Sequence, residues 1–336
     1  MSFKFGILDQ SIVYPNSTPT EALQNTIKLA QLAETLGYER FWVSEHHDSP
    51  SIAGSSPEVL ISHILAHTST IKVGSGGVML QHYSPYKVAE NFNLLGTLAP
   101  NRVELGVGRA PGGLPKSTKA LQKNIVEADS LKVKLVELQQ LLEGPLPETH
   151  ELAGLAANPN PVSPVPIFLL GTSEASAELA AEQGLPYAFA LFINNDPEVA
   201  KQAFEHYYTH FNYESGEQPT AILALSVIVA DTDEEAKALA STQKNVRVTL
   251  ASGKTVNLGS LEQAELYAKQ AGEAYTVVEK EADITKGTKE TVRERLLELA
   301  EQYKVKQFIF TGNIADFNKR ARSFTLLKEV FEEELV

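Results

Sequence analysis

RFWVSEHHD, residues 40–48, begins as a short apolar run and ends in a cluster of ionisable side chains. Two later segments have the same form, since strand-like runs lead into GSGGVML from Gly74 and into GVGRAPGG from Gly106. In α/β barrels the loops that follow parallel strands gather at one rim, and the active site lies there. The sequence therefore predicts an enzyme site at the carboxyl ends of a set of strands.

Strand-like and helix-like segments alternate along most of the 336 residues. Eight strands are predicted, at residues 5–8, 40–44, 71–75, 102–106, 167–170, 187–191, 221–230 and 307–310. Parallel strands need long crossover connections, which are usually helices, and the alternation supplies them. We therefore predict an α/β fold with one (β/α)8 TIM barrel over residues 1–336. A doubly wound open sheet is the alternative.

The first predicted helix has a well-marked start. Thr18 can cap it, Pro19 suits its first turn, and Glu21 stands three residues after the cap, as a capping box requires. Two further helices are predicted to begin at Ser56–Pro57 and at Ser84–Pro85, where a serine again precedes a proline. These signals support the crossover helices that a barrel needs.

Two regions interrupt the alternation. After a helix predicted over residues 119–142, six prolines lie within residues 145–166, which excludes regular structure and predicts a connector. Residues 245–287 are polar and poor in strand signals, with one predicted helix at residues 261–271. We interpret this second region as an insertion, which is either a lid over the site or a surface excursion without a role.

The composition restricts the classes of partner. Acidic residues outnumber basic ones, 42 to 29, and the net charge of −13 argues against a nucleic-acid partner, which would need clustered cations. No cysteine is present, which removes disulfides, thiolate nucleophiles and thiolate metal ligands. No signal peptide and no membrane-spanning run of about 20 apolar residues is recognised. A cytoplasmic protein with a small-molecule substrate and no membrane partner is expected.

His46 and His47 follow the second predicted strand. A histidine at this rim can exchange a proton with a reaction intermediate near neutral pH, and Glu45 or Asp48 can orient its ring. The alternative is a pair of hydrogen-bonding histidines that only shape the loop. No metal site is predicted, because adjacent side chains point in different directions and no third ligand is fixed by spacing.

The two glycine-rich segments predict a ligand site beside these histidines. Gly74, Gly76 and Gly77 allow the backbone to approach a flat ligand, although a tight turn without a ligand also explains them. Arg109 follows the fourth strand, and its guanidinium can hold a phosphate or form a salt bridge with a carboxylate. The glycine spacing from Gly106 does not match a dinucleotide fingerprint.

Thr172, Ser173 and Ser176 follow the fifth strand, at the start of an alanine-rich helix. Hydroxyls and free amides at a helix start can bind an anion, and Arg109 can converge on the same point. Plain N-capping by Thr172 or Ser173 is the alternative. We favour a phosphate ligand, because phosphate sites are common near the late strands of barrels.

These residues stand in blocks that resemble the bacterial luciferase-like flavin monooxygenases, in particular the short single-chain members. The similarity is dense over residues 32–113, resumes over residues 169–190, and is looser from residue 194 onward. The blocks that carry it are RFWVSEHH, SPEVLI, GSGGVML, SPYKVAENFNLL, GRAPGG and LLGTSEASAELAAEQGLPYAFA. Their order makes the match specific, and one small departure is Asn101, where relatives often have glycine.

The resemblance implies a (β/α)8 barrel that binds reduced FMN at the carboxyl ends of its strands. His46 matches the catalytic histidine of the family. Gly76 and Gly77 match the pair that backs the isoalloxazine ring, which a non-proline cis peptide joins in relatives. The residues that match positions around the FMN phosphate are Arg109, Thr172, Ser173 and Ser176.

The resemblance also implies the reaction and its partners. An FMN-dependent monooxygenase would use reduced FMN and O2 to oxidise a small organic substrate. A separate NAD(P)H-dependent flavin reductase would supply the reduced FMN, which fits the lack of a second nucleotide motif. A homodimer is expected, and Glu90 matches a position near the flavin edge or the dimer contact. The alternatives are an F420-dependent hydride-transfer oxidoreductase of the same fold and a non-catalytic flavin-binding protein.

Overall fold

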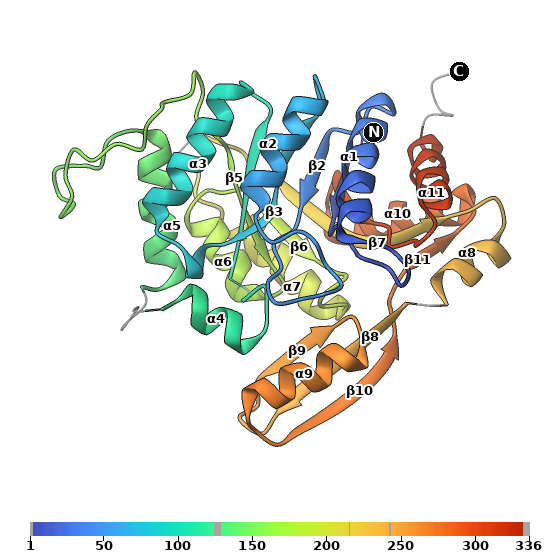
Figure 1. Cartoon of the computed structure of the whole chain (residues 1–336). Coiled ribbons are helices and arrows are strands. Elements are labelled where there is room, and N and C mark those ends of the chain that lie inside the picture. The colour runs from blue at the N-terminus through green and yellow to red at the C-terminus, as the bar shows by residue number, and fades with distance from the viewer. Residues whose placement is uncertain (1–2, 110, 124–128, 215, 242, 332–336) are drawn as a thin grey trace.

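Eight parallel strands close into a barrel in the computed structural model, which describes residues 3–109, 111–123, 129–214, 216–241 and 243–331 (Figure 1). In their order around the barrel, the strands are β1 (Lys4–Asp9), β2 (Arg40–Val43), β3 (Lys72–Met79), β4 (Val103–Gly108), β5 (Ile167–Gly171), β6 (Tyr187–Ala190), β7 (Ala221–Val229) and β12 (Gln307–Thr311). Because β7 pairs with both β6 and β12, and β12 pairs with β1, the ring has no open edge. The predicted TIM barrel is confirmed, and the open sheet is excluded.

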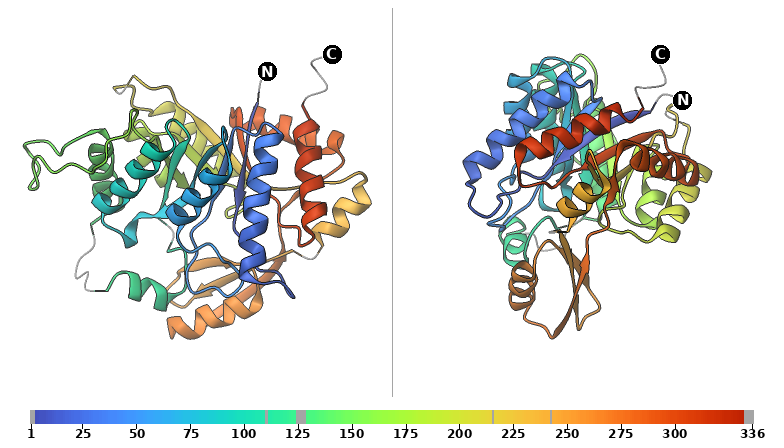
Figure 2. Two further views of the ribbon diagram at one scale, coloured as in Figure 1. Left: turned by 45° about the horizontal axis from the view of Figure 1, so that its top comes forward. Right: turned by 90° about the vertical axis from the view of Figure 1, so that its right-hand side faces the viewer.

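Helices surround the barrel (Figures 1 and 2). In chain order, those outside the insertion are α1 (Pro19–Thr35), α2 (Pro57–His67), the short 3-10 helix η1 (Leu80–His82), α3 (Pro85–Leu98), α4 (Pro115–Leu121), α5 (Leu131–Glu143), α6 (Glu174–Glu182), α7 (Pro197–Thr209), α8 (Asp233–Ala240), α10 (Lys289–Tyr303) and α11 (Phe317–Glu329). The predicted capping box is confirmed, because Thr18 Oγ1 accepts the Glu21 amide at 3.2 Å and Glu21 Oε2 accepts the Thr18 amide at 2.8 Å. Pro57 and Pro85 open α2 and α3 as predicted, but the serines before them make no side-chain cap bond.

The prediction of a single helix over residues 119–142 is wrong. α4 and α5 are two separate helices, and residues 124–128 between them lie outside the described part of the chain. α5 has its own start, since Ser130 Oγ accepts the Val133 amide at 3.3 Å. The connector over residues 145–166, all of them described, contains neither helix nor strand, as predicted.

β3 is longer than predicted. It continues from Gly74 through the glycine pair to Met79, so GSGGVML belongs mostly to the strand and not to a loop. A register shift between Gly76 and Val78 marks a bulge against β4. The peptide between Gly76 and Gly77 is cis, as the resemblance implied.

The barrel interior is filled by side chains from most of the strands. Leu8, Trp42, Phe168 and their neighbours on β6, β7 and β12 form one buried cluster. Gly74 and Gly76 of β3 leave the room that the indole occupies, because a Cβ at either position would lie 2.9 or 3.3 Å from Trp42 atoms. The glycines of β3 are therefore matched to the largest side chain of the interior.

A buried ion pair lies in the same interior, toward the amino ends of the strands. Arg40 Nε donates to Glu104 Oε2 at 2.9 Å, and the two side chains are only 4% and 3% exposed. Trp42 Nε1 donates to the same oxygen at 2.7 Å, and Arg40 Nη1 donates to Gln307 Oε1 at 2.8 Å. The cost of burying the two charges is offset by their mutual attraction and by these additional bonds.

The insertion contains a three-stranded antiparallel sheet, in the order β10 (Tyr275–Glu281), β8 (Lys244–Leu250) and β9 (Thr255–Leu258), and the helix α9 (Leu261–Ala271). The predicted helix is confirmed, and the three strands were not predicted, because the sequence of this region is poor in strand signals. Every second residue of β8 is apolar and buried, with Val246 and Val248 packing against Ala264 and Tyr267 of α9. β10 is mostly exposed, which explains why its sequence carries a weak apolar signal.

The insertion lies across the carboxyl end of the barrel (Figure 1). Gln263 Nε2 donates to Ser51 Oγ, in the loop after β2, at 2.6 Å. Asn257 Nδ2 donates to the Ile193 carbonyl, after β6, at 2.8 Å. Leu114, after β4, packs in the apolar cluster of the insertion. Beyond the insertion, β11 (Thr285–Gly287) pairs with the end of β7.

Glu104→Leu is expected to lower the free energy of unfolding by about 3 to 5 kcal/mol, because Arg40 would remain as a buried and unpaired charge. The double variant Arg40→Met/Glu104→Leu removes both charges and is expected to recover most of this loss. Urea denaturation followed by circular dichroism measures both values. A double variant as unstable as the single one would show that lost packing, and not an unpaired charge, sets the cost.

Candidate active site

At the carboxyl end of the barrel, the residues that face inward differ in side chain from one strand to another. Gly76 and Gly106 occupy these positions on β3 and β4. Across the barrel, Ser226 of β7 and Thr311 of β12 share a hydrogen bond of 2.9 Å between their hydroxyls. The mouth of the barrel therefore has a glycine side without side chains, opposite a side that carries hydroxyls.

His46 lies just beyond β2, next to the glycine side. Its Nδ1 is 3.0 Å from Ser44 Oγ, and its amide donates to the Gly54 carbonyl at 2.9 Å. The protein around the ring lowers the pKa of His46 from 6.5 to about 4 by burial, and the nearby Glu45 charge opposes this shift only in part. His46 is therefore neutral at pH 7, so one ring nitrogen can accept a proton and the other can donate one.

Glu45 is a buried carboxylate that organises the loop. It is 2% exposed, its Oε1 accepts the Tyr83 hydroxyl at 2.8 Å, and its Oε2 accepts the Met79 amide at 3.1 Å. His47 Nε2 lies 2.8 Å from the same Oε1. Burial and the charge of Glu45 raise the pKa of Tyr83, so its hydroxyl stays protonated and continues to donate.

The prediction that Glu45 or Asp48 orients the histidine ring is correct only for His47. Glu45 binds His47, whereas the ring of His46 is bonded to Ser44. Asp48 points away to the insertion, where its Oδ2 accepts Gln270 Nε2 at 3.2 Å. The two histidines therefore have different partners, as expected for adjacent side chains that point in different directions.

The loops after β2 and β4 contact each other directly. The His47 amide donates to the Gly112 carbonyl at 2.7 Å. Gly112 has a φ of +60°, which favours glycine, and a Cβ at Gly113 would lie 2.8 Å from the His47 carbonyl oxygen. The paired glycines that end GRAPGG are thus needed for the contact with the histidine loop.

Packing of the barrel alone disfavours a side chain at positions 76 and 77. A Cβ at Gly76 would lie 2.6 Å from Leu8 Cδ1, and a Cβ at Gly77 would lie 2.6 Å from the Gly106 carbonyl oxygen. The lack of side chains at these positions is therefore explained without a ligand. Their place behind a flavin ring stays a prediction.

Arg109 directly follows β4 and is exposed. Among the described residues its guanidinium has no hydrogen bond and no ion pair, so the salt-bridge alternative finds no partner in this part of the chain. β4 pairs with β5 as far as Val107, which lies opposite Leu169. Arg109 therefore follows β4 at the same end of the barrel at which the loop leading into α6 follows β5.

The start of α6 combines a cap with unused donors. Ser173 is the N-cap, since its Oγ accepts the Ser176 amide at 3.4 Å. Ser176 Oγ donates to the Ser173 carbonyl at 2.6 Å and lies 2.9 Å from the Tyr187 hydroxyl. Thr172 takes part only through its carbonyl, which accepts Asn194 Nδ2 at 2.9 Å. Capping by Ser173 is therefore present, and among the described residues neither the Thr172 hydroxyl nor the Arg109 guanidinium has a hydrogen-bond partner.

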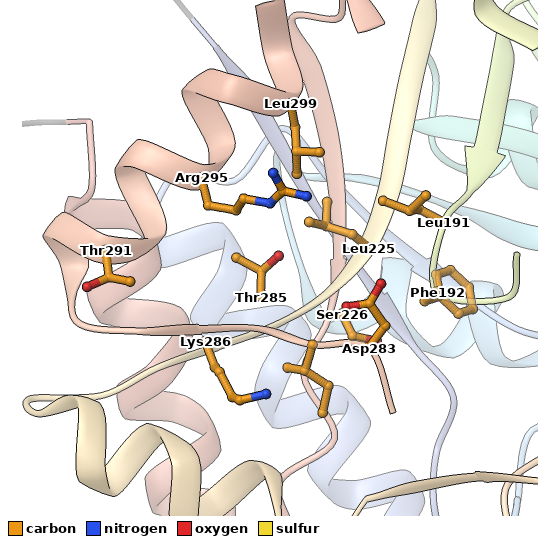
Figure 3. A pocket seen from close by; sticks show the side chains of 11 residues that line it. Leu191, Phe192, Leu225, Ser226, Asp283, Thr285, Lys286, Thr291, Arg295 and Leu299 are labelled. Carbon is orange, nitrogen blue, oxygen red and sulfur yellow. The ribbon is translucent and has the colours of Figure 1, made fainter. Parts of the chain in front are cut away.

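Some features of the site were not predicted from the sequence. Ser44 as the partner of His46 and Tyr83 as the partner of Glu45 were missed, although Tyr83 stands directly before a predicted helix start. Glu90 lies on α3, where it pairs with Lys87 at 3.2 Å. A cavity between β6, β7, β11 and α10 is also new, and none of the predicted site residues lines it (Figure 3).

In the described ranges of the chain, no group of three or more histidine, aspartate or glutamate residues is placed to hold a metal ion. Over the same ranges, none of the helices is both long and apolar enough to cross a membrane.

A closed (β/α)8 barrel with these groups on the loops after its strands defines the class of barrel enzymes whose site lies at the carboxyl ends of the strands. A family model described as "Luciferase-like monooxygenase" matches residues 3–305. The chain belongs to this family of flavin-dependent monooxygenases, as its resemblance had indicated.

Relatives match over nearly the whole length. An N-acetyl-S-alkylcysteine monooxygenase of Bacillus subtilis (strain 168) is 43% identical over 330 residues, which are 97% of each chain. A luciferase-like monooxygenase of Escherichia coli (strain K12) is 34% identical and covers 98% of each chain. The crystal structure of apo-MsnO8 is 33% identical, covers 98% of both chains and superimposes with a TM-score of 0.80.

The depressed pKa of His46 predicts a dependence of stability on pH. Between about pH 6.5 and 4 the unfolded chain binds a proton on this ring that the folded protein does not bind, so folding stability falls as the pH falls. Because the side chain keeps some exposure, we expect wild type to lose about 1 to 3 kcal/mol more than His46→Gln between pH 7 and pH 4. Urea denaturation at both pH values measures this, and equal losses would show that the ring titrates as a free imidazole.

Proposed function

We propose that this chain is an FMN-dependent monooxygenase that uses reduced FMN and O2 to oxidise a small organic thioether of the N-acetyl-S-alkylcysteine type. One observation carries the proposal: His46, the glycine pair and Arg109 lie on three consecutive strands or directly after them, at the same rim of the barrel. The substrate class comes from the relative of Bacillus subtilis that is 43% identical over 97% of both chains.

The residues at this rim fit FMN. Arg109, without an acidic partner among the described residues, and the first turn of α6 offer a cation and backbone amides to the phosphate. Thr172, Ser173 and Ser176 add hydroxyls at the same place. The glycine side of the mouth, at Gly76 and Gly77, offers a flat surface to the ring system. When bound, reduced FMN supplies the electrons with which O2 is activated and one oxygen atom is transferred.

His46 moves a proton in this proposal. Ser44 holds Nδ1 at 3.0 Å, and Nε2 has no partner among the described residues, so that nitrogen is free to face the reacting groups. The ring is neutral because burial lowers its pKa to about 4. The bonds of Glu45 to His47, Tyr83 and the Met79 amide keep the loop in place while the proton moves.

The insertion, residues 244–281, acts as a lid in this proposal. Its contacts with the loops after β2, β4 and β6 span the mouth of the barrel. Covering the mouth excludes water, which prevents loss of the activated oxygen before the substrate is oxidised. The alternative of a surface excursion without a role is less well supported, because a segment without a role would not need three separate docking points.

The reduced FMN comes from a separate NAD(P)H-dependent flavin reductase, and the protein is a homodimer. Large apolar side chains on the two helices that follow β2 and β3 support such a contact. Val59 of α2 is 67% exposed, and Leu94 and Leu98 of α3 are 50% and 67% exposed. Exposed apolar patches of this kind mark interaction surfaces.

The proposal is tested by mixing the protein with chemically reduced FMN and N-acetyl-S-methylcysteine under 18O2. We expect consumption of O2 and a product that carries one labelled oxygen atom, which mass spectrometry detects. Reduction of a substrate with reduced F420, without incorporation of labelled oxygen, would support the F420-dependent alternative. Tight flavin binding without any product would leave only a non-catalytic flavin-binding protein.

His46→Ala is expected to lower turnover by at least about 100-fold, because a positioned acid or base contributes roughly 100- to 10,000-fold. The affinity for FMN should change little, since His46 does not face the phosphate. Stopped-flow turnover and fluorescence titration with FMN measure the two quantities. His63→Ala, on the exposed face of α2, is the control. Undiminished turnover of His46→Ala would remove this residue from the mechanism.

Arg109→Ala is expected to weaken FMN by about 1.5 to 3 kcal/mol, the range for a hydrogen bond to a charged group. Fluorescence titration with FMN and with riboflavin measures the loss, and riboflavin, which has no phosphate, should bind equally to both proteins. Arg322→Ala is the matched control, because Arg322 is a half-exposed arginine on α11. An unchanged affinity for FMN would place the phosphate elsewhere.

A further inference from the structure

Two amide side chains lie next to the hydroxyl side of the barrel mouth. Gln10 directly follows β1, and Asn313 comes two residues after the end of β12, the strand that pairs with β1. Leu8 of β1 belongs to the cluster inside the barrel, and Thr311 of β12 shares its hydrogen bond with Ser226 at the mouth. Because alternate residues of a strand point to the same face, Gln10 and Asn313 are the next residues on the inward side.

The residues that precede these two amides are bound from outside the barrel, which supports this placement. Asp9 pairs with Arg320 of α11 at 2.9 Å. Arg320 Nε also donates to the Gly312 carbonyl at 2.6 Å. The helix that packs outside the barrel therefore holds Asp9 and Gly312, whereas the amide side chains that follow them face the mouth.

The amide pair, Gln10 and Asn313, makes one hydrogen bond and leaves two groups unused. Asn313 Nδ2 donates to Gln10 Oε1 at 3.3 Å. Within the described part of the chain, Asn313 Oδ1 is buried and accepts no hydrogen bond, and Gln10 Nε2 donates none. A buried acceptor without a donor is costly, and few are found in native structures. The amide pair therefore offers one acceptor and one donor to a ligand.

The backbone of Asn313 is held by the root of the insertion. Gln243 directly precedes β8, and its Nε2 donates to the Asn313 carbonyl at 2.8 Å. Ala282 directly follows β10, and its amide donates to the Gln243 carbonyl at 3.3 Å. Both ends of the insertion therefore meet at the residue with the unused acceptor. An acceptor that the protein already holds in place lowers the cost of binding a ligand.

An N-acyl amide has the groups that complement this pair. Its N–H donates one hydrogen bond, which Asn313 Oδ1 can accept, and its carbonyl oxygen accepts one, which Gln10 Nε2 can donate. The thioether of an N-acetyl-S-alkylcysteine has no donor, and its carboxylate is ionised at pH 7 and only accepts. The acyl amide is therefore the part of such a substrate that satisfies the buried acceptor.

We propose that Gln10 and Asn313 bind the N-acyl amide of the substrate and thereby select substrates that carry a secondary amide. The inference rests on the proposed function, because the ligand is the substrate of the same site. β1 lies between β12 and β2 in the barrel, so the amide would be held next to the strand that leads to His46. The two residues orient the substrate, and they take no part in the transfer of the proton.

The test compares N-acetyl-S-methylcysteine with its O-acyl analogue, in which an ester oxygen replaces the amide N–H. The analogue keeps the carbonyl, the carboxylate and the sulfur, but it places an acceptor against Asn313 Oδ1. We expect wild type to bind the amide about 10-fold or more tightly than the ester, because the ester leaves a buried acceptor unpaired. Calorimetric titration in the presence of oxidised FMN measures both affinities without turnover. Equal affinities would overturn the inference, and this comparison needs no variant.

Two variants separate the roles of the pair. Asn313→Leu removes the acceptor, so its affinities for the amide and the ester should differ by no more than about twofold. Gln10→Leu removes the donor to the carbonyl, which both compounds retain, so both affinities should fall roughly 3- to 10-fold while the preference for the amide remains. Asn212→Leu, at another half-buried asparagine, which follows α7, is the control and should resemble wild type. An undiminished preference for the amide in Asn313→Leu would place the amide elsewhere. Thermal unfolding verifies that each variant is folded.

Further outcomes separate this inference from the flavin site and from the proposed reaction. The flavin ring also carries an N–H between two carbonyl groups, so the affinity of each variant for FMN alone is measured by fluorescence titration. We expect no change, and a loss in Asn313→Leu would assign the amide pair to the flavin. Binding that prefers the amide, without any oxidation by wild type, would sustain this inference and overturn the proposed reaction. Oxidation of the amide and the ester with equal kcat/KM would sustain the reaction and overturn this inference.

Discussion

The limited space inside a closed eight-stranded barrel constrains the rest of this structure. Trp42 and Arg40 place two large side chains on β2, and the neighbouring strands accommodate them with glycine. A Cβ at Gly6 would lie 2.5 Å from Arg40 Cγ, and a Cβ at Gly74 would lie 2.9 Å from the Trp42 indole. Large side chains on one strand and small ones on its neighbours fill the interior at the density of a protein core. The same pattern leaves glycine at the inward-facing positions of β3 and β4 at the mouth.

Burial of charge organises the site as well as the core. Glu104 inside the barrel and Glu45 at its mouth are each 2% exposed, and each accepts hydrogen bonds from several donors. A buried carboxylate without these partners would be costly, so the donors around it are held in fixed positions. Around Glu45 the donors belong to the loop after β2 and to the end of β3 and the segment after it. The histidine loop is therefore anchored by hydrogen bonds to a buried carboxylate, although it lies at the mouth of the barrel.

Much of the fold was predictable because its signals are local. Pro19 with the capping box marks a helix start. The alternation of helices and strands indicates a parallel barrel, and this pattern can be recognised without knowing how the side chains pack. The three-stranded sheet of the insertion was not predicted, because β10 is largely exposed and an exposed strand needs few apolar residues. The position of a candidate residue at the rim was predictable where it follows a strand, as His46 and Arg109 do. The cavity lined by Lys286 and Arg295 was not predictable. Its position depends on where β6 ends relative to β11, and the register of strand pairing cannot be derived from a single sequence.

The connection between β10 and β11 links the insertion to the cavity in the barrel wall. β10 ends at Glu281 and β11 begins at Thr285, so residues 282–284 form the connection by which the chain returns from the insertion to the barrel wall. Asp283 and Ile284 of this tether line the cavity. Three residues span at most roughly 10 Å, so the end of β10 must stay within about that distance of the start of β11. One edge of the insertion and one side of the cavity are therefore held together by a single short connection.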